Sequence, residues 1–162
     1  MKCLIFRFVR TKAGLSCNVF HFFQALMANG AVKISEQSGV LPIAGDMVVL
    51  ITARGSGRWI IPKGYIEKGM TPAESAAKEA WEEAGIIGKV LPEEIGAYSF
   101  RRPSGIFSVR VYPLEVESLL DEWEEMHVRQ RRLVTPAEAI ELICHQELRM
   151  LVTDYFVNRF NL

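Results

Sequence analysis

Short apolar segments, separated by glycine and proline, follow one another along the chain from residue 39. The first three are 39–43, 47–53 and 58–61. Segments of this length that are rich in valine and isoleucine and are bounded by turn residues are typical of strands. Pro62 directly follows the third segment and has no backbone N–H to donate, so we expect that strand to stop there.

Three more strands are expected further along, at 94–100, 106–116 and 131–134. In the longest of them Phe107, Val109 and Val111 alternate with polar residues, so one face of that strand is apolar. The segment 101–105 is expected to form a hairpin loop between the first two of these strands. The acidic segment 119–126 is expected to be a loop or a short helix.

Two helices are predicted by the same local pattern. Thr71 and Thr135 are each followed by a proline and, three positions later, by a glutamate. This is a capping box, in which the threonine and glutamate side chains bond backbone N–H groups at the start of a helix. Gly85 is expected to end the first helix, and a further helix is expected at 147–160. Strands and helices together predict an α+β or α/β sandwich.

Residues 1–35 contain no Asp or Glu, and they carry an apolar patch at 19–28. The outline is that of a secretory signal, but His21 and Gln24 interrupt the patch, which is too short and too polar to span a bilayer. We expect a leader or disordered extension over 1–35, or an over-long start with Met27 as the first residue. The folded domain is expected over 36–162.

Composition narrows the class of protein. A chain of 162 residues with 49% apolar and 23% charged residues is typical of one globular domain, which excludes a disordered or fibrous chain. Lys plus Arg and Asp plus Glu number 19 each, so a long nucleic-acid contact and a membrane partner are not expected. The three cysteines, Cys3, Cys17 and Cys144, form no CxxC pair, which favours a reducing compartment and a cytoplasmic location.

Three glutamates gather on the first predicted helix. At about 100° per residue, Glu79, Glu82 and Glu83 fall within an arc of about 100°, and an alanine stripe occupies another arc. Like charges at this spacing cost roughly 0.2–0.5 kcal/mol per pair. A hard divalent cation would reverse that cost, because it takes oxygen ligands and favours clustered negative charge. A solvated acidic helix face is the alternative, and the spacing alone leaves both open.

The loop before this helix adds two further candidates. Gly64 permits a tight backbone turn, so a backbone carbonyl near it is a candidate metal ligand. Lys63 is a candidate partner for a phosphate oxygen. An ordinary glycine-containing loop and an ordinary surface lysine are the alternatives.

The segment from Gly64 to Ile86 resembles the signature of a known family. It reads Gly64-x5-Met70-x7-Lys78-Glu79-Ala80-x-Glu82-Glu83-x-Gly85-Ile86 and is similar to the Nudix box, G-x5-E-x7-R-E-U-x-E-E-x-G-U, in which U is a bulky aliphatic residue. The resemblance implies an α/β/α sandwich with a mixed central sheet. It also implies Mg²⁺, with Mn²⁺ as a possible substitute, held by Gly64, Glu79, Glu82 and Glu83. Hydrolysis of a phosphoanhydride is the implied reaction, with the three glutamates as catalytic residues.

Three positions depart from the Nudix pattern: Met70 replaces Glu, Lys78 replaces Arg, and Ala80 replaces a larger aliphatic residue. In the family, the residues at the first two positions are thought to brace the loop against the helix. Here we expect Glu67 to supply a substitute carboxylate and the site to be active. The alternative is a catalytically weak Nudix-like module that binds a nucleotide or polyphosphate and regulates a partner.

The segment Glu79–Gly85 and the later Trp123-Glu124-Glu125 resemble the subgroup that cleaves diphosphoinositol and diadenosine polyphosphates. The expected partner is therefore a small polyphosphorylated substrate, and removal of a 5′ pyrophosphate from RNA is a further option. Glu124 or Glu125 is a candidate for an additional carboxylate, unless both belong to an exposed acidic loop.

A polyphosphate also requires positive charge around it. The candidates for substrate binding are Lys63, Arg101, Arg102 and Arg110, with a further cluster at Arg129, Arg131 and Arg132. Surface ion pairing is the alternative for each arginine.

Overall fold

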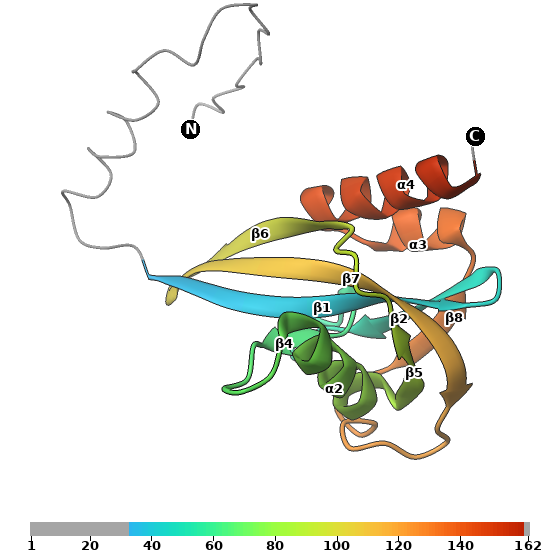
Figure 1. The fold of residues 1–162 in the computed structure, drawn as a ribbon, viewed down its shortest axis with the longest axis horizontal. Coiled ribbons are helices and arrows are strands. Elements are labelled where there is room, and N and C mark those ends of the chain that lie inside the picture. The colour runs from blue at the N-terminus through green and yellow to red at the C-terminus, as the bar shows by residue number, and fades with distance from the viewer. Residues whose placement is uncertain (1–32, 161–162) are drawn as a thin grey trace, which may run out of the picture. The chain divides into compact units, whose positions relative to one another are not determined.

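The computed structural model describes residues 33–160, which fold around one mixed β-sheet (Figure 1). The strands are β1 (Ile34–Ala44), β2 (Met47–Thr52), β3 (Trp59–Ile60), β4 (Lys63–Tyr65), β5 (Ile86–Val90), β6 (Gly96–Arg102), β7 (Gly105–Leu119) and β8 (Arg131–Val134). The helices are α2 (Pro72–Ala84), α3 (Pro136–Leu142) and α4 (Gln146–Phe160).

The sheet is built around the long parallel pair β1 and β7, whose register runs from Ile34 opposite Ile106 to Ile43 opposite Glu115. The main path through the sheet is β3-β2-β1-β7-β5, while β4 pairs with β1, β6 with β7 and β8 with β2. All of these other pairings are antiparallel. The predicted mixed central sheet is therefore confirmed.

Helices cover both faces of this sheet, α2 on one and α3 with α4 on the other (Figure 1). Adjacent residues of β1 serve opposite sides, because Leu41 packs into the cluster beneath α3 and α4 whereas Val40 packs against the alanines of α2. Both side chains are fully buried. A strand buried on both faces is apolar in consecutive positions, which explains the continuous apolar sequence at 40–44, in the second half of β1. The α/β/α sandwich is thus confirmed.

Helix α2 begins and ends where the sequence predicts. The Thr71 hydroxyl accepts from the Glu74 N–H, the Glu74 carboxylate accepts from the Thr71 N–H, and Gly85 follows the helix with φ 60°. The carbonyls of its last turn are bonded by later residues: Trp123 Nε1 donates to the Glu83 oxygen at 3.1 Å and Arg131 Nη1 to the Ala84 oxygen at 2.7 Å.

Arg131 therefore has a structural position rather than the phosphate-binding one considered from sequence. Its guanidinium also lies 4.3 Å from the centre of the Trp123 ring. A cation at the C-terminal end of a helix offsets the partial negative charge of the exposed carbonyls. The segment 119–126, predicted as a loop or a short helix, contains the end of β7 and turns.

Two short strands were not predicted, and one loop was placed wrongly. β4 begins directly after Pro62. Its residues, Lys63–Tyr65, form a strand because they pair with β1. β5 begins directly after Gly85, where the sequence offers no turn-bounded apolar segment. Arg101 and Arg102 were predicted in the hairpin loop, but they belong to β6, since Arg102 pairs with Gly105 and only Pro103 and Ser104 form the turn.

The leader or extension predicted for 1–35 lies outside the described residues, except that β1 already begins at Ile34. Within the described range, no helix is long and apolar enough to cross a membrane.

Packing at the end of α2 leads to a testable prediction. An added Cβ at Gly85 would lie 2.8 Å from Trp123 Cβ, whereas one at Gly45, at nearly the same φ of 61°, would meet nothing within 4 Å. Alanine at either position loses about 1 kcal/mol of stability, because its Cβ disfavours the left-handed backbone conformation. Gly85→Ala is expected to lose about 1–3 kcal/mol more than Gly45→Ala, because the loop must also shift. Equal losses in urea denaturation would show that the Trp123 contact is not tight.

Candidate functional site

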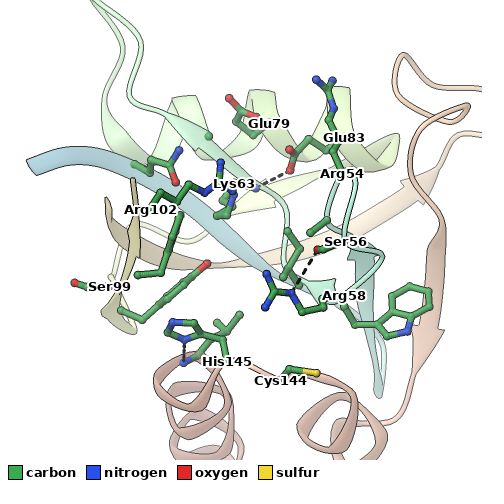
Figure 2. Close-up of a pocket in the computed structure, with 18 of the residues that line it drawn as sticks. Arg54, Ser56, Arg58, Lys63, Glu79, Glu83, Ser99, Arg102, Cys144 and His145 are labelled. Atoms are coloured by element: carbon green, nitrogen blue, oxygen red, sulfur yellow. Dashed lines mark hydrogen bonds between the residues drawn. The ribbon is translucent and has the colours of Figure 1, made fainter. Parts of the chain in front are cut away.

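A cavity of about 1060 Å³ opens between α2, the β2–β3 turn, β6 and the start of α4. Figure 2 shows Glu79 and Glu83 on one side of it and Cys144 with His145 on the opposite side. Its charged lining residues are Arg54, Arg58, Lys63, Glu79, Glu83, Arg101, Arg102, Glu125 and Arg129.

The acidic side is formed by two of the three predicted glutamates. Glu79 and Glu83 are four residues apart and so share one helix face, which lines the cavity. Glu82 is not among the lining residues, and its carboxylate pairs with Lys78 Nζ at 2.6 Å. The sequence placed all three within one arc, but only the tertiary packing decides which part of that arc meets the cavity.

Glu83 is the most deeply buried carboxylate of this group, with 4% of its surface exposed. Its Oε2 accepts from the backbone N–H of Lys63 at 2.8 Å, and its Oε1 accepts from Nη2 of Arg129. Burial raises the pKa of Glu83, and Arg129 acts in the opposite direction. The carboxylate is thus held between β4 and the segment before β8.

Glu79 packs directly against the backbone of β4. A Cβ placed on Gly64 would lie 1.7 Å from Glu79 Oε1, so any other residue there would displace the Glu79 carboxylate. Burial, followed by the charges of Glu83 and Glu82, raises the pKa of Glu79 to about 7. The role predicted for Gly64 as a metal ligand remains a prediction, but its position beside the carboxylate is established.

The departures from the box are compensated as expected. Lys78 Nζ lies 2.7 Å from Glu67 Oε1, so an ion pair still joins the loop to the helix. The Glu67 backbone N–H also donates to Ser75 Oγ at 3.0 Å. Met70, at the family's glutamate position, is 39% exposed.

The basic side contains three of the four predicted cations. Lys63, Arg101 and Arg102 line the cavity, and Arg110 does not. Arg110 is exposed, and its Nε donates to Glu94 Oε2 at 2.6 Å, so its predicted contact with substrate stays a prediction that this cavity does not support. Arg110 lies on the polar face of β7, as strand alternation predicts. The sequence pattern could not show that the segment before β6 would supply the carboxylate, Glu94, that pairs with it.

Several lining residues were not predicted from sequence: Gln37, Arg54, Arg58 and His145. Arg54 and Arg58 flank the glycine-rich turn after β2, and a turn with an arginine at each end is a signal that the sequence did contain. Gln37 carried no signal, because it lies in a polar segment before the first predicted strand, and polar residues are mostly solvent-exposed. His145 Nδ1 accepts from the Leu148 N–H at 3.3 Å at the start of α4.

Aromatic rings in this cavity support the cations. Phe100 and Phe107 stack with their centres 5.1 Å apart and their planes at 5°. Lys63 Nζ lies 5.7 Å and the Arg102 guanidinium 5.3 Å from the centre of the Phe100 ring. Cation–π contacts of this kind hold positive charge in place.

Gln37 contributes a polar group without a protein partner. It is 7% exposed, and its Oε1 has no hydrogen-bond partner among the described residues. A buried unpaired amide oxygen costs about 1–3 kcal/mol. Because Gln37 lines the cavity, a bound ligand can supply the missing donor.

The donor chemistry of the acidic side fits a divalent cation. Glu79, Glu83 and Glu125 all offer the hard carboxylate oxygens that Mg²⁺ prefers, and burial together with the nearby charges of Glu83 and Glu82 raises the pKa of Glu79. Within the described part of the chain, however, no three His, Cys, Asp or Glu side chains converge as a ready metal cluster. Glu83 is bonded to Arg129 instead.

Comparison with known proteins identifies the family. The model described as "NUDIX domain" matches residues 35–153. This chain belongs to the Nudix family. Nudix hydrolases generally use divalent metal ions, which agrees with the donor chemistry of the acidic side.

Two curated relatives illustrate the similarity. The chain is 35% identical over 115 residues to Nudix hydrolase 21, chloroplastic, of Arabidopsis thaliana, covering 69% of this chain and 57% of that protein. It is 33% identical over 105 residues to diphosphoinositol polyphosphate phosphohydrolase 3-alpha of Homo sapiens, covering 62% and 63%. The chain thus spans less than two thirds of the length of either relative. Other Arabidopsis relatives are named mitochondrial, so the cytoplasmic location stays a prediction.

Solved Nudix structures share the fold. An Ap4A hydrolase of C. elegans has a TM-score of 0.65 at 17% identity, covering 77% of this chain and 98% of its own. A MutT protein from Methanosarcina mazei has a TM-score of 0.68 at 16% identity, covering 82% and 99%. At these identities the likeness concerns the fold.

The raised pKa of Glu79 predicts how stability depends on pH. Its ordinary value is 4.5 and its folded value is about 7, so the folded state holds this proton more tightly and loses stability as pH rises between the two. In EDTA at about pH 8, Glu79→Gln is expected to be more stable than the wild type by on the order of 1 kcal/mol. The difference should vanish toward pH 4.5.

Urea denaturation at several pH values measures this difference, with Glu124→Gln as the control because Glu124 is exposed and does not line the cavity. A Glu79→Gln variant that is less stable than the wild type at every pH would contradict the assignment.

Proposed function

We propose that this protein is a Mg²⁺-dependent pyrophosphohydrolase that cleaves a phosphoanhydride bond in a small polyphosphorylated molecule. The observation that carries the proposal is that one cavity joins a carboxylate group to a set of cations. Among the described residues, Arg58, Lys63, Arg101 and Arg102 have no ion-pair partner. An anionic substrate would complement the cations, and a divalent cation bound with it would complement the carboxylates.

The acidic side would hold the cation through Glu83 and Glu79, with Glu125 as the further carboxylate. Of the two loop glutamates considered from sequence, only Glu125 lines the cavity. Glu82 and the carbonyl near Gly64 remain proposed ligands. When bound, the cation would neutralise phosphate oxygens and lower the pKa of the attacking water.

Glu79 is the candidate to accept a proton from that water. Its pKa of about 7 is close to neutral pH, where a general base is most effective. The same side chain is also a candidate ligand, and these two roles are alternatives. Water would form a new bond to phosphorus, and the bridging P–O bond would break to release the other phosphorylated product.

The basic side would bind the rest of the substrate. Lys63, Arg101 and Arg102 are proposed to contact phosphate oxygens, and Arg58 is added to them from the structure. Both aromatic partners of Arg102, Phe100 and Phe107, already stack on each other. Because the rings stack on each other and on Arg102, they hold positive charge rather than a base. We therefore expect a substrate with additional phosphate charge beyond the bond that is cleaved, of the diphosphoinositol polyphosphate or dinucleoside polyphosphate type.

Turnover tests the proposal directly. The protein is incubated with Mg²⁺ and with dinucleoside polyphosphates, diphosphoinositol phosphates, nucleotide sugars, damaged nucleoside triphosphates, and capped or triphosphorylated RNA, and the products are identified. For the substrate that is cleaved, Glu83→Gln and Glu125→Gln are expected to lower kcat/KM by about a hundredfold or more, because each removes a cation ligand. Glu124→Gln, a matched change in the neighbouring exposed residue, is expected to leave kcat/KM near the wild-type value.

Near-normal rates for Glu83→Gln would show that the ligand assignment is wrong. Thermal stabilisation by a polyphosphate without any turnover, with or without Mg²⁺, would favour the alternative of a regulatory binding module.

Gln37 provides a second, independent test of the cavity. Gln37→Met removes the unpaired amide at similar length and is expected to stabilise the ligand-free protein by about 1 kcal/mol. The same change is expected to reduce the thermal shift produced by a dinucleoside polyphosphate, used as a polyanionic probe because its ribose hydroxyls and base amino groups can donate to the amide oxygen of Gln37.

Ser38→Ala is the matched control for this test. Ser38 Oγ is also buried and unpaired, but Ser38 does not line the cavity. It should therefore gain stability without any change in the ligand-induced shift. If Gln37→Met also raises the stability of the ligand-free protein but leaves the ligand-induced thermal shift unchanged, Gln37 lies outside the binding site.

A further inference from the structure

Arg129 is a buried cation inside the acidic side of the cavity. It is 9% exposed, and all three guanidinium nitrogens donate hydrogen bonds. Nη2 bonds to Glu83 Oε1, Nε bonds to Glu125 Oε2, and Nη1 bonds to the Thr52 carbonyl oxygen at 2.9 Å. One side chain thus joins α2, the segment after β7 and the end of β2.

Backbone contacts fix the position of this arginine. The Arg129 N–H donates to the Glu125 carbonyl at 3.0 Å. The next residue, Gln130, exchanges hydrogen bonds with Thr52 through both its N–H and its carbonyl, at 2.9 and 3.0 Å. A short, well-bonded connection of this kind presents the guanidinium to the two glutamates in one orientation.

The consequence for Glu83 is that no carboxylate oxygen is left without a partner. Oε1 faces Arg129, and Oε2 faces the Lys63 N–H. A divalent cation approaching Glu83 meets a fixed positive charge in a poorly solvated site, where charge repulsion is strong. Glu79 differs, because its carboxylate has no ion-pair partner among the described residues and packs against Gly64.

We propose that Arg129 is the resident counter-cation of Glu83 and Glu125 and competes with the divalent cation for Glu83. Arg129 thereby satisfies two buried carboxylates in the ligand-free protein, and it lowers the cation affinity of that state. A substrate phosphate entering the cavity offers Arg129 other acceptor oxygens, since guanidinium binds phosphate bidentately. The inference rests on the proposed function, because it takes Glu83 to be a cation ligand.

Manganese binding without substrate tests this competition. Free Mn²⁺ is measured by electron paramagnetic resonance for the wild type and for Arg129→Gln, Arg129→Lys, Arg54→Gln and Glu83→Gln. Arg129→Gln is expected to bind Mn²⁺ about tenfold more tightly than the wild type, because the repelling charge is gone. Arg129→Lys keeps the charge and is expected to stay within about threefold of the wild type.

Arg54→Gln is the matched control. Arg54 also pairs with Glu125, but its side chain is 60% exposed and it does not contact Glu83. Its loss should leave Mn²⁺ affinity within about threefold of the wild-type value.

A measurement on the wild type keeps the test independent of whether the variants fold. During Mg²⁺ titration, NMR follows the Nε–Hε signal of Arg129 and the backbone amide of Lys63, which bonds to Glu83. Both signals are expected to shift together, while the side-chain signal of Arg110, paired with Glu94 outside the cavity, stays in place.

The outcomes separate the two proposals. If Mn²⁺ uptake requires Glu83 but Arg129→Gln binds no more tightly than the wild type, the competition is overturned and the metal site stands. A Lys63 amide that shifts while the Arg129 signal does not would also overturn the competition. If neither the wild type nor Arg129→Gln takes up Mn²⁺, the cation site itself is wrong, and both proposals fail.

Discussion

The burial of one carboxylate, that of Glu83, is the constraint on which the rest of the site depends. A charged group removed from water is tolerated only if every oxygen finds a donor. Here the donors come from the Lys63 backbone and from Arg129, so β4 and the segment before β8 must both close on α2. Gly64 leaves room for the Glu79 carboxylate beside β4, which a side chain at that position would displace.

This constraint also organises the two halves of the cavity. The carboxylates gather where α2 meets β4, and cations without an ion-pair partner among the described residues lie on β4, β6 and the turn after β2. Two of them, Lys63 and Arg102, lie against the Phe100 ring. Part of the charge in this cavity is therefore paired, through Arg54 and Arg129, and part is not. The proposed polyphosphate with its divalent cation would satisfy the remaining charges, and Arg129 would serve the acidic half when neither is bound.

Local sequence signals predicted most of the framework. Both capping boxes, the left-handed Gly85, the alanine stripe of α2 and the β6–β7 hairpin depend on neighbouring residues, whose energies act within a few positions. β4 and β5 were missed because each is short and exists through pairing with β1 or β7, which no local pattern encodes. The hairpin loop was predicted to be longer than it is for the same reason. Arg102 belongs to β6 only because it pairs with Gly105.

The sequence by itself determined the family signature, the α/β class and the helix that carries the glutamates, because each is written in spacing along the chain. Only the tertiary structure decided that Glu79 and Glu83 face the cavity while Glu82 pairs with Lys78, and that Arg110 lies outside it. It alone brought Gln37 to the site and placed Arg129, one of the candidate cations, between Glu83 and Glu125. The physical reason is that the direction of a side chain follows from local geometry, but its electrostatic partners come from segments tens of residues away, which meet only when the sheet and helices pack.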